Sequence, residues 1–117
     1  MPIRLYHNPR CSKSREALAL LREHGVQPQV VEYLKQPLSA AQIERLLLQL
    51  GLEPRALMRR GETVYKELNL DDPALSRMAL IDAMAQQPIL IERPIAVRGE
   101  RAVVGRPPEK VLELLDG

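Results

Sequence analysis

The chain of 117 residues has a single cysteine, Cys11, and contains neither tryptophan nor phenylalanine. One cysteine excludes a disulfide within the chain and the cysteine spacings of zinc sites, so we expect no bound metal. With three tyrosines as the aromatic side chains, the core must consist mainly of Leu, Ile, Val, Ala and Met. Few aromatics and a formal net charge of only +2 argue against a nucleic-acid partner, because nucleic-acid-binding proteins normally have a strongly basic face.

Long hydrophobic runs are also missing. No stretch approaches the ~20 apolar residues that are needed to span a bilayer. The N-terminal segment MPIRLYHNPR lacks the apolar region of a secretory signal. We therefore expect a cytoplasmic protein without a membrane partner. The length and a hydrophobic content of 45% suit one domain over residues 1–117.

The first third of the sequence alternates strand and helix signals. The β-type run IRLY starts at Ile3 and is followed by the turn signal Asn8-Pro9. A helix is expected from about Ser12 until just before Gly25, and a second strand over 29–34. This order of strand, helix and strand predicts a parallel pair of strands joined by a crossover.

The middle of the chain, about 38–88, has helical patterns. Helix-starting serines, helix-ending glycines and prolines predict four short helices, over 39–51, 54–60, 62–70 and 76–87. These segments are too few to bury much surface by themselves. They predict a helical insertion within the domain.

The end of the chain returns to strand patterns. Residues 89–97 and 101–105 are mostly apolar, and Gly99 suits a tight hairpin turn between them. Pro94 interrupts the first run, so the strand should resume at Ile95. An amphipathic helix is expected over 107–117. The whole order is β-α-β, helices, β-β-α, which is an α/β fold.

Cys11 stands where the first helix should begin, close to three cations, Arg10, Lys13 and Arg15. Helix N-termini and nearby cations both lower the pKa of a thiol, and the thiolate is the nucleophile. The same backbone N–H groups can hold an oxyanion. A lone cysteine is more often a small buried apolar residue, but these polar neighbours favour a reactive thiol.

Two further residues can support the thiol. His7 is the nearest possible base, although a turn histidine that caps the helix or is exposed to solvent is an equally good interpretation. Ser14 adds a hydroxyl donor. The spacing also excludes one class of enzyme, because tyrosine phosphatases need Cys-x5-Arg and the residue six positions after Cys11 is Ala17.

Four segments together resemble the glutaredoxin-dependent arsenate reductases, the ArsC-like proteins, and their close relatives. These are YHNPRCSKSR, RALMRR, PILIERPIAV and VVGRPPE, in this order and at the spacing of the family. The resemblance runs from Ile3 to Leu115. It implies a thioredoxin-like fold, in which a mixed four-stranded sheet carries a helical insertion.

The resemblance also implies roles for individual residues. Cys11 corresponds to the nucleophilic cysteine. Three arginines that hold the oxyanion and the arsenic intermediate fall on Arg59, Arg93 and Arg106. Pro94 corresponds to the cis-proline that faces the active site in thioredoxin-like folds. Guanidinium groups bind tetrahedral oxyanions in a bidentate manner, and thirteen of the seventeen cations are arginines.

The implied reaction is the reduction of arsenate to arsenite through a bond between the Cys11 thiolate and arsenic. Because no second cysteine is present, an external thiol must resolve the intermediate. The resemblance implies glutathione as co-substrate and glutaredoxin as partner, with no bound cofactor, in arsenic detoxification.

The chain departs from established arsenate reductases in one motif, and two other functions stay open. It has CSKS where those enzymes typically have CGTS. Spx-type relatives are regulators that bind RNA polymerase and sense thiol oxidation, but Ser14 takes the place of the second cysteine of their switch. A monothiol oxidoreductase acting on glutathione mixed disulfides would use Cys11 and leave Arg59 and Arg106 without a clear task.

Overall fold

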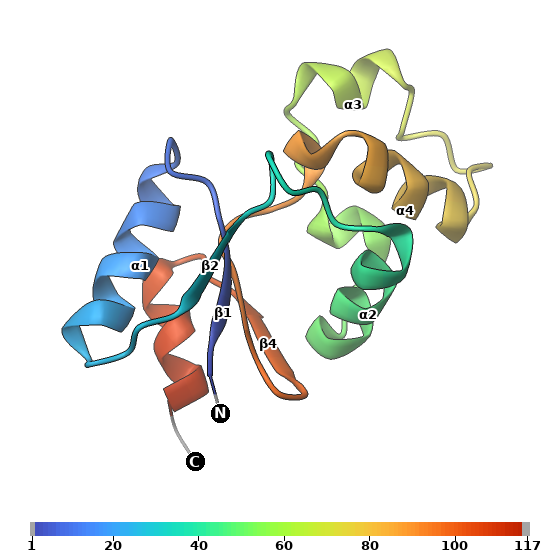
Figure 1. The fold of residues 1–117 in the computed structure, drawn as a ribbon. Helices are drawn as coiled ribbons and strands as arrows, with labels where there is room; N and C mark the ends of the chain where they lie inside the picture. The colour runs from blue at the N-terminus through green and yellow to red at the C-terminus, as the bar shows by residue number, and fades with distance from the viewer. Residues whose placement is uncertain (1, 116–117) are drawn as a thin grey trace. The chain divides into compact units, whose positions relative to one another are not determined.

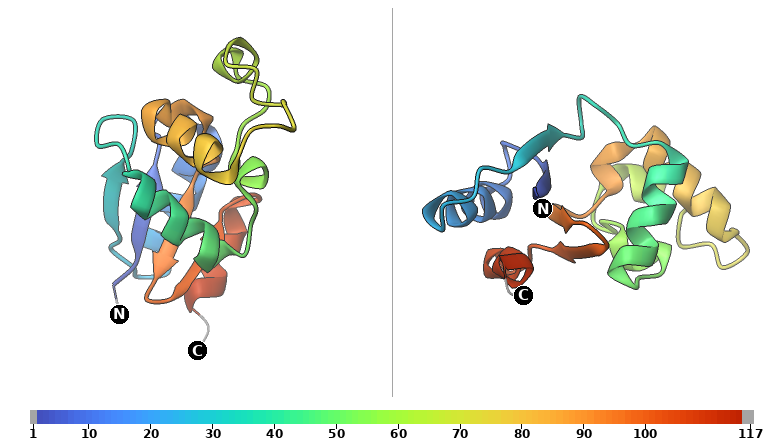
Figure 2. Two further views of the ribbon diagram at one scale, coloured as in Figure 1. Left: turned by 90° about the vertical axis from the view of Figure 1, so that its right-hand side faces the viewer. Right: turned by 60° about the horizontal axis from the view of Figure 1, so that its bottom comes forward.

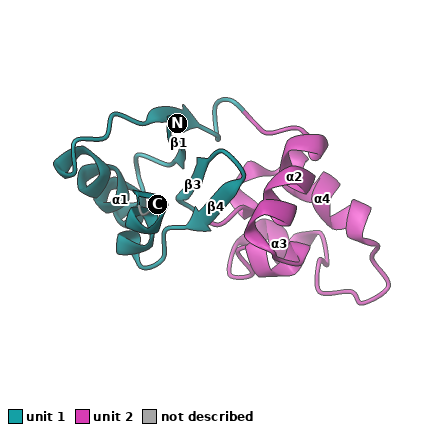
Figure 3. Ribbon diagram, turned by 90° about the horizontal axis from the view of Figure 1, so that it is seen from below, with its two compact units in different colours: residues 1–36, 93–117 teal, residues 37–92 magenta. Residues whose placement is uncertain are grey.

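A computed structural model describes residues 2–115, and the chain divides into two compact units (Figure 3). Unit 1 contains residues 1–36 and 93–117, and unit 2 contains residues 37–92. The helical insertion predicted over about 38–88 corresponds to unit 2 with slightly wider bounds. That the two units form a single domain stays a prediction.

Unit 1 begins with the predicted strand, helix and strand (Figure 1). They are β1 (Arg4–His7), α1 (Ser12–Glu23) and β2 (Gln29–Glu32). β1 and β2 pair in parallel, as expected from a crossover connection. After α1 the chain turns at Gly25, which has a φ of 79°. Such a positive φ is readily adopted by glycine, which explains why the helix stops here.

Two antiparallel strands from the end of the chain complete the sheet. They are β3 (Ile95–Arg98) and β4 (Arg101–Val104), and the strand order is β2-β1-β3-β4. β3 pairs antiparallel with β1 and with β4, and Gly99 at the hairpin turn has a φ of 60°. The prediction of a mixed four-stranded sheet is confirmed.

The core of unit 1 lies between the sheet and two helical segments. α1 and the 3-10 helix η3 (Pro108–Leu115) pack against each other and lie on the same side of the sheet (Figures 1 and 2). The side chains buried there are aliphatic, as the scarcity of aromatics predicted: Ile3, Leu5, Ala17, Leu21, Ala96, Val111 and Leu114.

η3 lies where the sequence predicted an amphipathic helix, and it is wound as a 3-10 helix. Arg98 Nη1 donates to the carbonyl of Leu114 and Arg101 Nη2 to that of Glu113, both at 2.6 Å. These bonds satisfy carbonyls at the end of the segment, which would lack partners in a helix of any winding. The last two residues of the predicted helix, 116–117, lie outside the described residues.

Unit 2 is helical, and α2 packs against α4. Its elements are α2 (Ala40–Leu50), η1 (Pro54–Leu57), α3 (Thr63–Glu67), α4 (Arg77–Gln86) and η2 (Pro88–Leu90). The Ser39 hydroxyl caps α2 within a capping box completed by Gln42, and Gly51 ends this helix in the left-handed conformation. The Ser76 hydroxyl caps α4 by accepting a hydrogen bond from the Ala79 N–H. All four predicted helical segments are present.

The apolar run after α4 does not form the strand that was predicted from the sequence. Residues 88–90 form a 3-10 helix, and strand pairing nearby is limited to one antiparallel bridge between Met58 and Ile91. An apolar run alone does not distinguish a buried strand from a buried helical turn. The strand itself begins at Ile95, after Pro94, as predicted. Among residues 2–115, no helix is long and apolar enough to cross a membrane.

Candidate active site

The loop between β1 and α1 fixes the start of the helix at Cys11. The side-chain oxygen of Asn8 accepts a hydrogen bond from the Arg10 N–H, and the backbone carbonyl of Asn8 accepts one from the Cys11 N–H, both at 3.0 Å. Arg15 reaches back from α1 and donates to the carbonyl of Pro9 at 2.9 Å. Cys11 is the N-cap residue of α1, with an extended backbone, as predicted. Arg15 therefore contacts the loop itself.

Cys11 is partly buried at the N-terminus of α1, close to polar groups that change the pKa of its thiol. Burial alone raises the pKa of the thiol. Hydrogen bonds from the backbone N–H groups of Ser14 and Lys13 and from the Arg93 guanidinium, with the charge of Arg93, outweigh this effect and lower the pKa below its usual value. These donors favour the thiolate, which is the nucleophilic form.

Three buried polar residues hold the loop in place by hydrogen bonds. The Ser14 hydroxyl accepts a hydrogen bond from the Asn8 N–H at 3.0 Å and lies 2.6 Å from His7 Nδ1. His7, Asn8 and Ser14 are all nearly inaccessible to solvent. His7 therefore uses Nδ1 to hold Ser14, whose own N–H contacts the sulfur. His7 Nδ1 is hydrogen-bonded to Ser14, whereas the sequence suggested that His7 acts as a base for the Cys11 thiol.

The stability of the protein should depend on the protonation of His7. Burial is the main cause that lowers the pKa of His7, Glu32 opposes it, and Arg22 and Arg15 add to it. Because the unfolded chain binds this proton more readily, stability is fully present above the unfolded pKa of about 6.5 and is lost as the pH falls towards the lower folded pKa.

We therefore expect the urea midpoint of the wild type to fall between about pH 7.5 and pH 5.5. In His7→Gln this fall should be smaller. His24→Gln, which removes the exposed histidine after α1, is the matched control and should keep the wild-type dependence. An identical pH dependence in His7→Gln and wild type would contradict the assignment.

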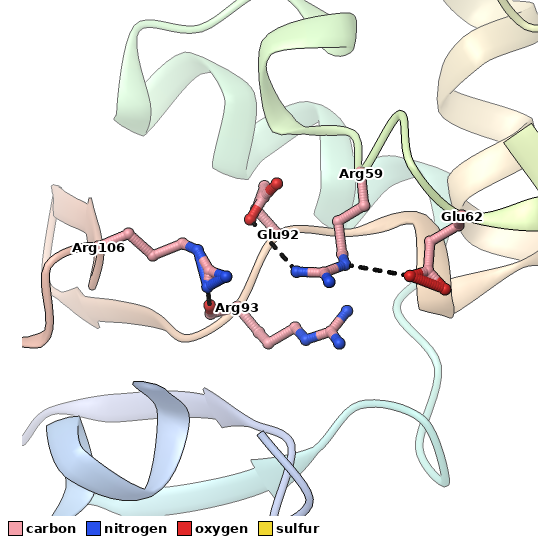
Figure 4. A network of polar contacts seen from close by, with 5 residues as sticks. All are labelled: Arg59, Glu62, Glu92, Arg93 and Arg106. Atoms are coloured by element: carbon pink, nitrogen blue, oxygen red, sulfur yellow. Dashed lines mark hydrogen bonds and ion pairs between the residues drawn. The ribbon is translucent and has the colours of Figure 1, made fainter. Parts of the chain in front are cut away.

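Arg93 lies two residues before β3, and its guanidinium is close to the Cys11 sulfur. Its Nε and Nη1 atoms are buried and have no hydrogen-bond partner among the described residues. The peptide bond between Arg93 and Pro94 is cis, as the resemblance implied, and so is the bond between Arg106 and Pro107. Arg106 Nη1 lies 3.5 Å from the Arg93 carbonyl oxygen (Figure 4). Unit 1 thus brings Cys11, Arg93, Pro94 and Arg106 into one region.

Gly105 fixes the position of this arginine-bearing segment, a role that was not predicted from the sequence. Its N–H donates to the carbonyl of Pro94 at 2.8 Å. A Cβ atom at this position would lie 2.8 Å from Pro94 Cγ and 3.0 Å from Val111 Cγ1. Such distances are shorter than van der Waals contact, so only glycine fits. Gly105, which lies between VV and RPP in the sequence, therefore holds Pro94 beside the site.

Gly105→Ala should destabilise the protein by about 1–3 kcal/mol, the usual cost of overpacking a well-packed site. Because the clash is with the ring of Pro94, beside the site, the activity of the site should also fall. The urea midpoint and turnover of the variant test this. Gly61→Ala is the matched control, because a Cβ there meets no atom within 4 Å. A variant as stable as wild type would show that Pro94 moves aside easily.

Arg59 belongs to unit 2 and follows the bridge residue Met58. Two carboxylates contact its guanidinium: Glu62 Oε2 lies 3.5 Å from Nε, and Glu92 Oε2 lies 3.7 Å from Nη1 (Figure 4). The sequence did not predict these partners. An i,i+3 spacing could have indicated Glu62, whereas Glu92 reaches Arg59 through the non-local pairing around Met58 and Ile91.

The arrangement in unit 1 suits nucleophilic attack on an anion. A stabilised thiolate lies at a helix N-terminus, beside a guanidinium whose buried Nε and Nη1 lack hydrogen-bond partners within residues 2–115. These donors match the oxygens of a tetrahedral oxyanion. Among residues 2–115, no group of three or more His, Cys, Asp or Glu side chains is arranged to hold a metal ion.

Comparison with known proteins agrees with the fold and the motifs. A sequence model of the ArsC family matches residues 6–114. The uncharacterized protein YfgD of Escherichia coli K12 is 56% identical over 114 residues, which are 97% of this chain and 96% of that protein. An arsenate reductase of Haemophilus influenzae is 46% identical over 116 residues, 98% of this chain and all of that protein.

Solved structures give the same result. An arsenate reductase from Vibrio cholerae has a TM-score of 0.94 and 57% identity, with 97% of both chains covered. A putative arsenate reductase from Yersinia pestis has a TM-score of 0.92 and 55% identity, covering 95% of this chain and 98% of that one. With these matches along nearly its whole length, the chain belongs to the ArsC family and has its thioredoxin-like fold.

Proposed function

We propose that the protein is an arsenate reductase whose nucleophile is Cys11. The observation that carries this proposal is the pairing of a stabilised thiolate with Arg93, whose Nε and Nη1 are buried without hydrogen-bond partners among the described residues. Arsenate is a tetrahedral dianion near neutral pH, and its oxygens can accept from these N–H groups. The similarity to the Haemophilus influenzae and Vibrio cholerae arsenate reductases supports the same substrate.

The first step follows from the chemistry of the site. The Cys11 thiolate attacks arsenic, a sulfur–arsenic bond forms, and one arsenate oxygen leaves as water after taking up protons. Arg93 and the backbone N–H groups at the start of α1 offset the negative charge that accumulates on the remaining oxygens. The family resemblance assigns a substrate-binding role to Arg59 and Arg106 as well.

The second step needs electrons from outside the chain, because Cys11 is the only cysteine. A glutathione thiolate displaces a further oxygen and bonds to arsenic. A second thiol, from glutaredoxin, then attacks the glutathione sulfur and forms a mixed disulfide. The bond between arsenic and the glutathione sulfur breaks, and its two electrons stay on arsenic, which passes from the +5 to the +3 state. Hydroxide from water then displaces the Cys11 sulfur from arsenic, so that arsenite and the Cys11 thiolate are released. This reaction requires a reducing compartment, which is consistent with a cytoplasmic protein.

The experiment that tests the proposal measures arsenate-dependent NADPH oxidation, coupled through glutathione, glutaredoxin and glutathione reductase. We expect turnover that requires arsenate, glutathione and the protein together. Omission of glutaredoxin should slow the reaction strongly, because glutathione would then have to supply both thiols.

The opposite result is equally informative. If Cys11 is alkylated rapidly at neutral pH but no arsenate-dependent oxidation occurs, arsenate reduction is excluded. The activated thiol would then serve another substrate, such as a glutathione mixed disulfide.

A further inference from the structure

Arg59 is held by two carboxylates of its own unit. Glu62 Oε2 and Glu92 Oε2 lie 3.5 and 3.7 Å from Nε and Nη1 of the guanidinium. Figure 4 shows the two glutamates reaching Arg59 from different segments of the chain. The group formed by Arg59, Glu62 and Glu92, here called the carboxylate clasp, carries two negative charges for one positive charge. An anion that approaches Arg59 therefore meets a net negative environment.

The backbone holds the carboxylate clasp in place. The Arg59 N–H donates to the carbonyl of Leu90 at 2.7 Å, and the Glu92 N–H donates to that of Leu57 at 2.8 Å. These two bonds flank the bridge between residues 58 and 91 and fix Glu92 beside Arg59. On the other side, the Glu62 N–H donates to the Arg59 carbonyl at 3.2 Å. Both carboxylates are thus placed by backbone hydrogen bonds.

The two glutamates neutralise the charge of Arg59 but do not provide hydrogen bonds for all of its N–H groups. Arg59 Nε is buried and has no hydrogen-bond partner among the described residues, even though Glu62 is near. In the same unit, Arg77 Nη2 and Glu44 Oε1 form a true hydrogen bond at 3.0 Å. A tetrahedral oxyanion could give Arg59 Nε the hydrogen bond that Glu62 does not supply. The carboxylates are therefore displaceable ligands.

We propose that Glu62 and Glu92 set the affinity of the protein for its oxyanion by competing with it for Arg59. The proposal rests on the proposed function, in which Arg59 binds the substrate. Binding an oxyanion requires the guanidinium to exchange its carboxylate contacts for the anion. Arsenate and phosphate have the same shape and charge, so the carboxylate clasp weakens the binding of both to the same extent.

The test uses Glu62→Gln and Glu92→Gln in the full-length protein, with inorganic phosphate as the probe in isothermal titration calorimetry. Each variant removes one competing charge and keeps the shape of the side chain. Because the side chains of the carboxylate clasp are about a quarter exposed, solvent screens the pair. We expect the phosphate Kd and the arsenate KM to fall about two- to fivefold in each variant. Glu53→Gln, an exposed glutamate paired with Arg77 in the same unit, should change neither.

A double-mutant cycle shows whether Glu92 acts through Arg59. In an Arg59→Ala background, Glu92→Gln should leave the phosphate Kd unchanged, because the competition has been removed. If Glu92→Gln still strengthens binding there, Glu92 acts by repelling the anion directly or through another cation, such as its chain neighbour Arg93, and the proposal is wrong. Unchanged or weaker phosphate binding in both single variants would also overturn it.

The two readouts separate this proposal from the proposed function. Phosphate binding does not require turnover. Stronger phosphate binding in the glutamine variants without arsenate reduction by any variant supports the carboxylate clasp and refutes the reductase. Arsenate reduction with phosphate affinity that does not respond to either substitution supports the reductase and refutes the carboxylate clasp. A protein that binds no phosphate in any of these forms also refutes the carboxylate clasp.

Discussion

Cys11→Ser should reduce arsenate turnover by about three orders of magnitude or more, the size of effect seen when an enzyme loses its nucleophile. The serine hydroxyl keeps the shape of the side chain and the hydrogen bonds at the start of α1. It stays protonated at neutral pH, however, whereas the hydrogen bonds from Ser14, Lys13 and Arg93 favour ionisation of the thiol. The measurement is the initial rate of arsenate-dependent NADPH oxidation in the coupled assay.

The control for Cys11→Ser is its fold and its chemistry with an alkylating reagent. The far-UV circular dichroism spectrum and the urea midpoint should match those of the wild type. Iodoacetamide should modify the wild type once and the variant not at all, because no second cysteine is present. Turnover near the wild-type rate in a correctly folded variant would exclude Cys11 as the nucleophile and, with it, the proposed reaction.

Those parts of the fold that depend on local signals could be predicted from the sequence. The Ser39 hydroxyl and Gln42 form a capping box, and Gly51 takes the left-handed conformation that a helix end requires. Each signal acts within a few residues of its own position, so neighbouring residues suffice to place it. The same holds for Cys11 as the N-cap of α1, because the turn at Asn8 and the helical pattern after Ser12 are both local.

Features that depend on distant segments could not be predicted in this way. The apolar residues 88–90 form a 3-10 helix whose strand-like pairing is reduced to the bridge between Met58 and Ile91. Whether an apolar run pairs as a strand is decided by its partner, which the run itself does not contain. The close packing of Gly105 on Pro94 is likewise visible only in three dimensions.

The residues of the candidate site could likewise be predicted from sequence motifs, whereas their contacts with distant residues could not. The sequence identified Cys11 and, through the resemblance, Arg93 and Arg106, which unit 1 brings into one region. The contact between Ser14 and His7 was not predicted, because the pairing of a buried hydroxyl depends on how α1 lies against β1. Two partners of Arg59, Glu62 and Glu92, were also missed, since an acidic residue in a sequence is usually a solvated surface charge.

Arg93→Ala should lower turnover about 100- to 1,000-fold, the effect of removing one preorganised donor from developing negative charge. It should also raise the pKa of Cys11, because the variant loses a hydrogen bond to the sulfur and a nearby positive charge. The pH profile of Cys11 alkylation would then shift to higher pH, and alkylation at neutral pH would become slower. The shift should be partial, since the N–H groups of Ser14 and Lys13 still contact the sulfur.

The variant should fold, because the wild-type guanidinium has two buried nitrogen atoms without hydrogen-bond partners among the described residues. An unsatisfied buried donor costs about 1–3 kcal/mol, so truncation at Arg93 removes an unfavourable contribution together with its packing. Arg93→Lys separates charge from geometry. It should restore much of the thiol reactivity and little of the turnover, since an ammonium cannot make the bidentate contact of a guanidinium.

Arg4→Ala is the matched control for Arg93→Ala, because Arg4 is exposed on β1 and makes a 3.4 Å hydrogen bond to Gln29. It should change neither turnover nor the alkylation profile. If Arg93→Ala leaves the alkylation profile in place while turnover falls, Arg93 acts on the oxyanion alone, and the backbone N–H groups of α1 account for the low thiol pKa. If the profile shifts and turnover persists, ionisation of the thiol does not limit the reaction, and Arg93 is not the donor that stabilises the arsenic intermediate.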